Sequence, residues 1–298
     1  MENSTRSAMI SVVGRPNAGK STLTNALAGE KVAIVSGKPQ TTRNRIRAII
    51  DRGNIQLVLI DTPGFHKART KLGDYMVRVV TESVADVDAI VLMVEPVPSA
   101  GPQELALIEK VRRAKCASVL VINKIDTVPK ERLLAVIAEY DKQHGFDAIL
   151  PVSAKNRDGT EELMQVLEKF AKPGPKLFPE GMVTDQPERQ ICAEIVREKL
   201  LCCLEKEIPH GTAVVVTRFS EREDTEIIDW DVTIYCEKAS HKGIIIGKNG
   251  EMLKKIGALA RADIEKFMGT KVFLQTWVKV RENWRDNDRL LRNFGYRE

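Results

Sequence analysis

An eight-residue phosphate-binding motif near the start of the chain constrains the fold more than any other feature. Residues 14–21 fit the pattern G-x-x-x-x-G-K-[S/T], after an apolar run at 9–13 and before a helix-like stretch at 21–27. Glycines allow a tight turn whose backbone N–H groups face phosphate oxygens, and a helix N-terminus adds partial positive charge. Lys20 is predicted to reach the β- and γ-phosphates and Ser21 to hold Mg²⁺. The motif comprises Gly14, Arg15, Pro16, Asn17, Ala18, Gly19, Lys20 and Ser21.

The rest of the first half alternates between strand and helix patterns. Short apolar runs are separated by segments in which apolar residues recur with helical spacing. Such alternation predicts an α/β fold with a mostly parallel sheet and helices on both faces. Residues 45–60 differ, because a turn at 52–54 divides them into a hairpin that makes one edge of the sheet antiparallel. The expected strands are 57–60, 89–94, 119–122 and 149–152, and the expected helices are 70–85, 101–114, 129–144 and 158–171.

Three further polar segments follow predicted strands, which is where open α/β sheets bind their ligands. In the first, we expect the Asp61 carboxylate to contact Mg²⁺ and the Gly64 N–H to bond the γ-phosphate. When hydrolysis removes the γ-phosphate, the Gly64 N–H loses its hydrogen-bond acceptor and the segment 61–65 relaxes. Such proteins switch in this way. The three segments are Asp61, Thr62, Pro63 and Gly64 with the adjoining Phe65; Asn123, Lys124, Ile125 and Asp126; and Ser153, Ala154 and Lys155.

The second and third of these segments predict a site for guanine. The Asp126 carboxylate can accept hydrogen bonds from both N1–H and the exocyclic amine of guanine. Adenine lacks that donor pair and would leave the carboxylate unpaired. We expect the Lys124 stem to lie along the base, Asn123 to tie this loop to the phosphate loop, and a backbone N–H of residues 153–155 to bond guanine O6. The nucleotide is therefore predicted to be GTP.

The four motifs in this order resemble the translation-factor class of GTPases, and residues 41–66 resemble the Era branch of that class. The resemblance implies that Thr42, in the first switch segment, coordinates Mg²⁺ in the GTP state. The adjacent Thr41 is the alternative candidate for this role. The resemblance also implies that Asn17 coordinates a K⁺ ion that acts like an arginine finger. The alternative for Asn17 is that it only stabilises the turn of the phosphate loop.

Hydrolysis by this chain is predicted to be slow. Phe65 stands where Ras-like proteins carry a water-orienting Gln, and an aromatic ring cannot position a water by hydrogen bonding. We expect His66 to be an exposed loop residue rather than a general base, because positioning dominates phosphoryl transfer. The groups expected to act on the reaction are Asn17, Lys20, Thr42 and Gly64.

The second half of the chain is predicted to be a separate domain. A length of 298 residues suits about two domains, and residues 173–186, rich in proline and glycine, read as a linker. The expected units are therefore 1–172 and 187–298, the second ending in a short helix. Its predicted elements are a helix at 187–206, strands at 211–219 and 227–237, a helix at 239–246, a longer helix to 268, a strand at 271–280 and a final helix at 284–294.

This α+β order, with an apolar helix end, the turn 247–250 and a basic amphipathic helix, resembles a type II KH module. Such a loop clamps the backbone of single-stranded RNA, and the alternative is an unrelated interaction domain. Residues 238–279 hold nine Lys or Arg against three acids, a local charge of +6 that suits a polyanion, although a solvated helix face could carry it too. The expected RNA-binding residues are Ile246, Gly247, Lys248, Asn249, Gly250, Lys254 and Lys255.

Two other groups of side chains in this domain could meet RNA. Trp277 lies near the end of the last predicted strand and Trp284 follows it. We expect both to be core or cap residues first, and base-stacking platforms only second. Four arginines at spacings of four, four and three form one helical stripe that could contact ribosomal RNA or be a solvated face. They are Arg281, Arg285, Arg289 and Arg292.

The cysteine usage and the apolar pattern of the sequence predict a cytoplasmic protein. The five cysteines form no C-x-x-C pair and are expected to be reduced, mostly buried thiols with no metal. No apolar run approaches the roughly 18–20 residues of a membrane span, and residues 1–6 do not begin a signal-peptide core. The family resemblance implies at most a peripheral contact with the inner face of the membrane, for which the sequence shows no anchor.

The leading interpretation is a GTP-hydrolysing switch fused to an RNA-binding module. The Era resemblance covers essentially the whole chain and implies recognition of the 3′ end of 16S ribosomal RNA during maturation of the small (30S) subunit, by a protein we expect to be a monomer. Alternatives are a P-loop kinase or ATPase, which the segment 123–126 opposes, a non-hydrolysing RNA-binding module stabilised by GTP, and a membrane-associated regulator.

Overall fold

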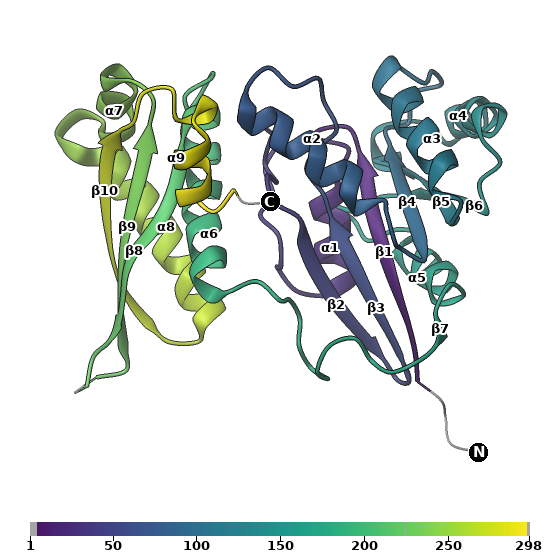
Figure 1. Ribbon diagram of the computed structural model, residues 1–298, viewed down its shortest axis with the longest axis horizontal. Coiled ribbons are helices and arrows are strands. Elements are labelled where there is room, and N and C mark those ends of the chain that lie inside the picture. Colours follow the sequence, from purple (N-terminus) through teal and green to yellow (C-terminus); the bar gives the residue numbers. More distant parts are fainter. Residues whose placement is uncertain (1–4, 224, 297–298) are drawn as a thin grey trace. The chain divides into compact units, whose positions relative to one another are not determined.

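A computed structural model describes residues 5–223 and 225–296 of the chain. Two compact units are present: Met1–Arg69 with Gly73–Asp185, and Thr70–Leu72 with Gln186–Glu298 (Figure 1). The expectation about a signal peptide falls largely on residues 1–4, which lie outside the described part. In the described part, no helix combines the length and the apolar character needed to cross a bilayer.

The first unit is built on a seven-stranded sheet in the order β2-β3-β1-β4-β5-β6, with β7 pairing beside β1. The pairs from β3 through β6 along this order are parallel, whereas β2 is antiparallel to β3. The predicted mostly parallel sheet with one antiparallel edge is thereby confirmed. The strands are β1 (Arg6–Gly14), β2 (Ile46–Arg52), β3 (Ile55–Asp61), β4 (Ala89–Val94), β5 (Ala117–Asn123), β6 (Ala148–Val152) and β7 (Lys172–Pro173).

Helices cover both faces of this sheet because its central strands are apolar on both sides. Along β1, Val12 packs into a cluster with Leu23 and Leu163, while its neighbour Val13 packs into another with Leu107 and Val136. Side-chain alternation thus places α1 and α5 on one face and α2, α3 and α4 on the other. The helices are α1 (Lys20–Ala28), α2 (Lys71–Ser83), α3 (Pro102–Ala114), α4 (Lys130–Gln143) and α5 (Thr160–Glu168).

The segment predicted as a linker is hydrogen-bonded to the first unit over most of its length. The Ile49 N–H of β2 donates to the Val183 carbonyl at 2.8 Å, which continues the sheet beyond its edge strand. The side chain of Gln56 exchanges two hydrogen bonds with the backbone of Phe178, at 2.9 and 3.0 Å. The Asp51 carboxylate accepts from the Gly181 N–H at 3.1 Å. We call residues 176–185 the strap, because they run along the β2–β3 hairpin.

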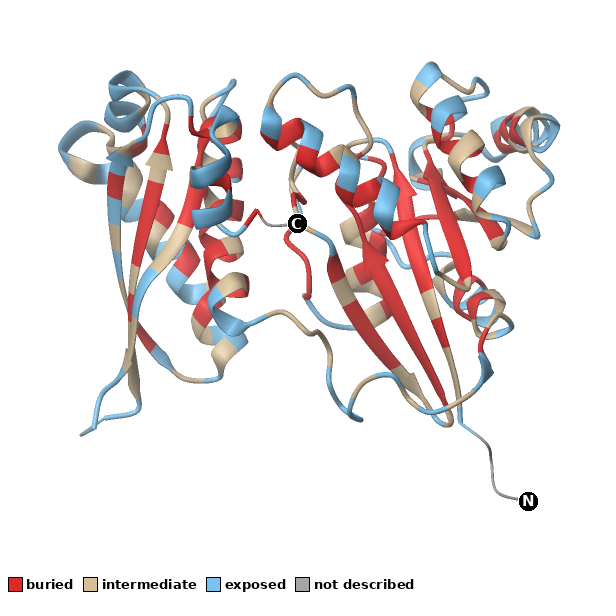
Figure 2. Ribbon diagram, viewed as in Figure 1, coloured by how far each residue is buried: buried red, intermediate tan, exposed pale blue. Residues whose placement is uncertain are grey.

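The second unit has a three-stranded sheet in the order β10-β9-β8, with β10 parallel and β8 antiparallel to β9. Alternate residues of β9, among them Trp230 and Val232, pack against Ile195 and Ile256 of the helices to form its core. Figure 2 shows buried stretches along the strands and helices of both units. The order helix, strand, strand, helix, helix, strand is the predicted one. The elements are α6 (Glu188–Cys203), β8 (Ala213–Glu221), β9 (Ile227–Cys236), α7 (Ala239–Ile246), α8 (Glu251–Met268), β10 (Lys271–Val280) and α9 (Asp288–Asn293).

Several side chains lie differently from expectation. Trp284 is fully buried, as predicted for a core residue, but Trp277 is 56% exposed. Trp277 belongs to the set of alternate β10 residues that point away from the helices, so the core expectation for it was wrong. The cysteines are less buried than expected: Cys192 and Cys236 are buried, whereas Cys202 is exposed.

The predicted final helix is interrupted, and this breaks up the arginine stripe. Asn287 has extended backbone angles and caps α9 by accepting from the Leu290 N–H, so a short 3-10 turn at 284–286 stands apart from α9. Arg285 lies in that turn and pairs with Glu237 at 2.6 Å. Of the four arginines, Arg289 and Arg292 lie on α9 and Arg281 precedes the turn. The expectation of one helical stripe was therefore wrong.

Candidate functional site

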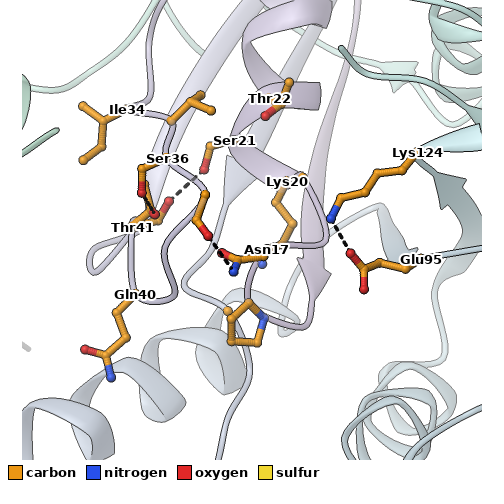
Figure 3. Close-up of a pocket in the computed structure, with 16 residues that line it drawn as sticks. Asn17, Lys20, Ser21, Thr22, Ile34, Ser36, Gln40, Thr41, Glu95 and Lys124 are labelled. Carbon is orange, nitrogen blue, oxygen red and sulfur yellow. Dashed lines mark hydrogen bonds and ion pairs between the residues drawn. The ribbon is translucent and has the colours of Figure 1, made fainter. Parts of the chain in front are cut away.

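The phosphate loop connects β1 to α1 and forms the floor of a cleft of about 560 Å³. Its tight path needs glycine at position 19, where φ is +99° and a Cβ would stand 2.2 Å from Nδ2 of Asn123. Residues 34–42, the segment before β2, line one side of the cleft, and Glu95 and Lys124 line the other (Figure 3). Loop, α1 N-terminus and these two sides together enclose a space suited to a polyphosphate.

Lys20 is held inside this loop by backbone oxygens. Its ammonium donates to the carbonyls of Arg15 at 2.9 Å and Gly14 at 3.2 Å, and the residue is 6% exposed. Burial lowers the pKa of Lys20 to about 8, and the opposite charge of Asp61 limits that fall. The arrangement keeps a cation at the point where phosphate oxygens can replace the two carbonyls.

The three predicted Mg²⁺ ligands lie together beside Lys20. Ser21 Oγ donates to Asp61 Oδ2 at 2.6 Å and lies 2.8 Å from Thr42 Oγ1, which is 3.4 Å from the same carboxylate oxygen. Asp61 is fully buried, and this burial raises its pKa to about 6. Among the described residues its other oxygen, Oδ1, has no hydrogen-bond partner. A buried carboxylate oxygen and two hydroxyls are the hard oxygen donors that Mg²⁺ takes.

Thr41, the alternative to Thr42, faces another way. Its hydroxyl donates to the Lys38 carbonyl at 2.6 Å and lies 2.7 Å from Ser36 Oγ, inside the loop before β2. The geometry therefore brings Thr42, and not Thr41, to Ser21.

The segment after β3 is packed onto the phosphate loop. Thr62 Oγ1 donates to the Val12 carbonyl at 2.7 Å, and the Phe65 N–H donates to the Gly14 carbonyl at 3.0 Å. The Phe65 ring turns away from the cleft into the core between the sheet and α3. His66 is half-buried rather than exposed as expected, because its Nδ1 lies 2.8 Å from the Gly64 carbonyl.

The base-recognition loops are joined by the side chain of Asn123. Its Nδ2 donates to the Ala18 carbonyl at 2.8 Å, and its Oδ1 accepts from the Ala154 N–H at 3.0 Å. Ser153 Oγ donates to Asp126 Oδ1 at 2.6 Å, and this bond lowers the pKa of Asp126. Asp126 is thus held ionised, with its remaining lone pairs available to a donor pair.

The remaining predicted base contacts lie at the same edge of the sheet. Lys124 has a left-handed backbone, with φ of +64°, which starts the short turn containing Ile125. Lys155 is exposed beside that turn. A second, shallower hollow lined by Thr22, Asn25 and Ala154 adjoins this end.

Glu95 is a site residue that sequence reasoning missed. It follows β4 directly, and its carboxylate forms an ion pair with the Lys124 ammonium in the cleft (Figure 3). Its position after a central parallel strand was the available indication, but no motif marks it.

Asn17 contacts the segment before β2. Its Nδ2 donates to the Gly37 carbonyl at 3.1 Å, and both residues line the cleft. The Asn17 amide oxygen and neighbouring carbonyls are neutral oxygen donors, the kind that a monovalent cation takes. The hydrogen bond to Gly37 fits a structural role of Asn17, and coordination of K⁺ by its amide oxygen stays a prediction.

In the second unit, the predicted RNA-binding loop joins α7 to α8. Gly247 has φ of +74°, and a Cβ there would stand 2.7 Å from the Met252 Cβ, so the turn needs glycine. Asn249 and Gly250 also have positive φ, which makes a sharp corner with exposed backbone before α8. The exposed side chains around it are Lys248, Asn249, Lys254 and Lys255, while Ile246 and Gly247 are half-buried.

Comparison with known protein families supports both halves of this description. The family model for 50S ribosome-binding GTPases matches residues 9–124, and that for the KH domain matches residues 207–285. GTPase Era of Ruminiclostridium cellulolyticum is 50% identical over 292 residues, which are 98% of each chain. GTPase Era of Clostridioides difficile is 48% identical over 294 residues, 98% of this chain and 99% of that one.

Two solved structures resemble the whole chain. One is Era in complex with MgGDPNP and nucleotides 1506–1542 of 16S ribosomal RNA, and the other is a point variant of Aquifex aeolicus Era bound to GDP·AlF₄⁻. Each has a TM-score of 0.95 and 34% sequence identity, and covers 99% of this chain and 100% of its own.

Proposed function

This chain belongs to the Era family of GTPases, and from that premise we propose that it is a GTP-driven switch that controls a hold on the 3′ end of 16S ribosomal RNA. One observation carries the nucleotide half of the proposal. The Asn123 side chain joins the phosphate loop to the segment 153–155. The guanine-selective Asp126 and the phosphate-binding Lys20 are thereby placed to bind the two ends of one nucleotide.

The residues divide the work on GTP by position. Lys20 would exchange its carbonyl partners for phosphate oxygens, and Ser21, Thr42 and Asp61 would hold Mg²⁺, which supplies positive charge beside the β- and γ-phosphates. Gly64 would donate its N–H to the γ-phosphate. Because Ser21, Thr42 and Asp61 already lie together beside Lys20, the fold presents the phosphate- and Mg²⁺-binding groups in place.

Hydrolysis is proposed to be slow. The Phe65 ring packs into the core and has no group that could orient an attacking water. A K⁺ ion held by the Asn17 amide oxygen is proposed to supply the charge that an arginine finger supplies elsewhere. This proposal is supported by the family resemblance and by the place of Asn17 in the lining of the cleft. Turnover would then act as a timer whose rate depends on the monovalent cation.

The RNA half of the proposal rests on the loop 247–250 and its lysines. The KH match and the solved Era complex with a 16S fragment support ribosomal RNA as the ligand. We propose from the family resemblance that this binding assists maturation of the 30S subunit. Since its substrate lies there, we place the protein in the cytoplasm, and we propose that it acts as a monomer. A peripheral contact with the inner membrane rests on family resemblance alone.

The test measures the affinity of the full chain for an RNA equivalent to nucleotides 1506–1542, with a GTP analogue and with GDP. We expect the two affinities to differ by about 5- to 150-fold, the usual span of coupling between two sites. Equal affinities would show that the nucleotide does not control RNA binding, and would favour an RNA-binding module that GTP only stabilises. Competition of ATP with GTP at equal strength would instead remove the guanine assignment.

A further inference from the structure

The side chain of Arg15 points out of the phosphate loop toward α3. Its Nη1 donates to Glu104 Oε1 at 3.0 Å, in the first turn of that helix. The Arg15 side chain is 50% exposed, whereas that of Glu104 is only 8% exposed. The phosphate loop is therefore tied to α3, which lies outside the lining of the cleft.

The position of Glu104 is costly without a cationic partner. Among the described residues, its second oxygen, Oε2, is buried and has no hydrogen-bond partner. A Cβ on Gly101 would stand 2.8 Å from that oxygen, so the carboxylate packs closely against the backbone just before α3. A buried, half-satisfied carboxylate is destabilising unless an opposite charge is fixed beside it. Here Arg15 provides that charge, aided by the N-terminus of α3.

Residues 14–16 are the part of the loop that this ion pair holds. The Arg15 carbonyl accepts from the Lys20 ammonium, and the Gly14 carbonyl accepts both from Lys20 and from the Phe65 N–H. A Cβ on Gly64 would stand 2.5 Å from the Cα of Pro16. The same three residues thus contact Lys20 on one side and the segment 61–65 on the other.

We propose that Arg15 is a positioning residue: anchored by Glu104, it fixes the peptide units that orient Lys20 and against which the segment 61–65 moves. Arg15 does not contact the nucleotide in this role. Its side chain acts through its own backbone, and Glu104 acts only through Arg15. The inference rests on the proposed GTP site and adds α3 to the parts of the protein that determine nucleotide affinity.

The experiment measures affinities for GTP and GDP, together with the midpoint of thermal unfolding, for the full chain and for Arg15→Met, Glu104→Gln and the double variant. We expect each single substitution to lower the affinity for both GTP and GDP by about tenfold. The double variant should be no weaker than Arg15→Met, because each residue needs the other. Arg15→Lys should restore part of the affinity, since it keeps the charge near Glu104.

A matched control is available on the same helix. Glu109 pairs with Arg112 and Arg113 on the exposed face of α3, so Glu109→Gln removes the same charge away from the loop and should leave both affinities unchanged. Three results would overturn the proposal: additive losses in the double variant, unchanged affinity in Glu104→Gln, or tighter binding in that variant, which would show Arg15 reaching the nucleotide once released. Wild-type GTP binding in the same assay separates these from failure of the GTP assignment itself.

Discussion

Gly64 and Pro16 are in backbone contact, so close that a Cβ on Gly64 would stand 2.5 Å from the Pro16 Cα. The switch segment can therefore approach the phosphate loop only with glycine at position 64. We predict that Gly64→Ala keeps GDP binding but abolishes the difference in RNA affinity between GTP analogue and GDP. Gly145→Ala is the control, because a Cβ at 145 meets open space. A preserved difference in Gly64→Ala would show that this contact does not carry the signal.

Asp126 should determine which base is bound. Asp126→Asn replaces an acceptor pair with one donor and one acceptor, which mismatches guanine but can meet the C2 carbonyl of xanthine. We expect GTP affinity to fall by about 10- to 100-fold and affinity for xanthosine triphosphate to rise. Competition binding with the two nucleotides measures both changes. The exposed Asp141→Asn should alter neither, and a variant that still preferred GTP would contradict the assignment.

Lys248 should contribute to RNA binding through charge. We predict that Lys248→Glu weakens RNA binding by roughly tenfold and reduces the slope of log affinity against log salt by about 1 for each lost phosphate contact. Lys266→Glu makes the same change near the far end of α8, where the residue is also exposed. Equal losses in the two variants would point to general electrostatic attraction rather than to the loop.

Asn17 should make turnover depend on the monovalent cation. We expect steady-state GTP hydrolysis to be faster in K⁺ than in Na⁺, and this ratio to fall to 1 in Asn17→Ala. Measurement at saturating GTP separates the effect from weaker nucleotide binding. Identical rates of the unaltered chain in the two salts would refute the ion and leave Asn17 as a residue that holds Gly37.

Asp51 should stabilise the strap in a pH-dependent way. Burial alone would raise the pKa of Asp51, but hydrogen bonds from Gly181 and Gln56 and the Lys176 charge hold it below its usual value. An acid with a lowered folded-state pKa stabilises the fold above its unfolded pKa, and this is lost as the pH falls through the folded value. We expect Asp51→Asn to lower the free energy of unfolding by about 1 kcal/mol at pH 7, and by progressively less as the pH falls below the ordinary Asp pKa of about 4.

The comparison for that experiment is Glu180→Gln, which removes an exposed partner of the same lysine. An exposed ion pair contributes little, so its unfolding midpoint should stay close to that of the unaltered chain. A gap between Asp51→Asn and the unaltered chain that did not narrow at low pH would mean that the Asp51 charge is not what matters.

The features that could be predicted from the sequence are those that depend on short motifs and on local runs of apolar residues. The four nucleotide motifs lie at strand ends, and strand ends are set by apolar runs such as 89–94 and 117–123. Once the sheet is parallel, those ends share one edge, so Ser21, Asp61 and Asn123 had to be neighbours. Thr42 was reached only by family resemblance, because the loop before β2 has no periodic pattern.

Features that could not be predicted depend on contacts between distant elements. The pairs of Lys124 with Glu95 and of Arg15 with Glu104 require knowing which strands and helices are adjacent. The alternation along β10 shows that Trp277 and Phe273 share one face, but not that the helices cover the opposite one. The strap was hidden for a similar reason: proline and glycine mark irregular backbone, whether it is free or bound to a sheet edge.

The Asn123 amide has a consequence for how this protein can change. One side chain braces the loop that reads the base and the loop that holds the phosphates, so neither can be exchanged as a separate module. A loop transplanted from a relative would have to place the backbone carbonyl of residue 18 or the backbone N–H of residue 154 where Asn123 can bond it, or lose that hydrogen bond. Altered base preference should therefore arise by substitution at Asp126 within an intact frame, rather than by recombination of loops.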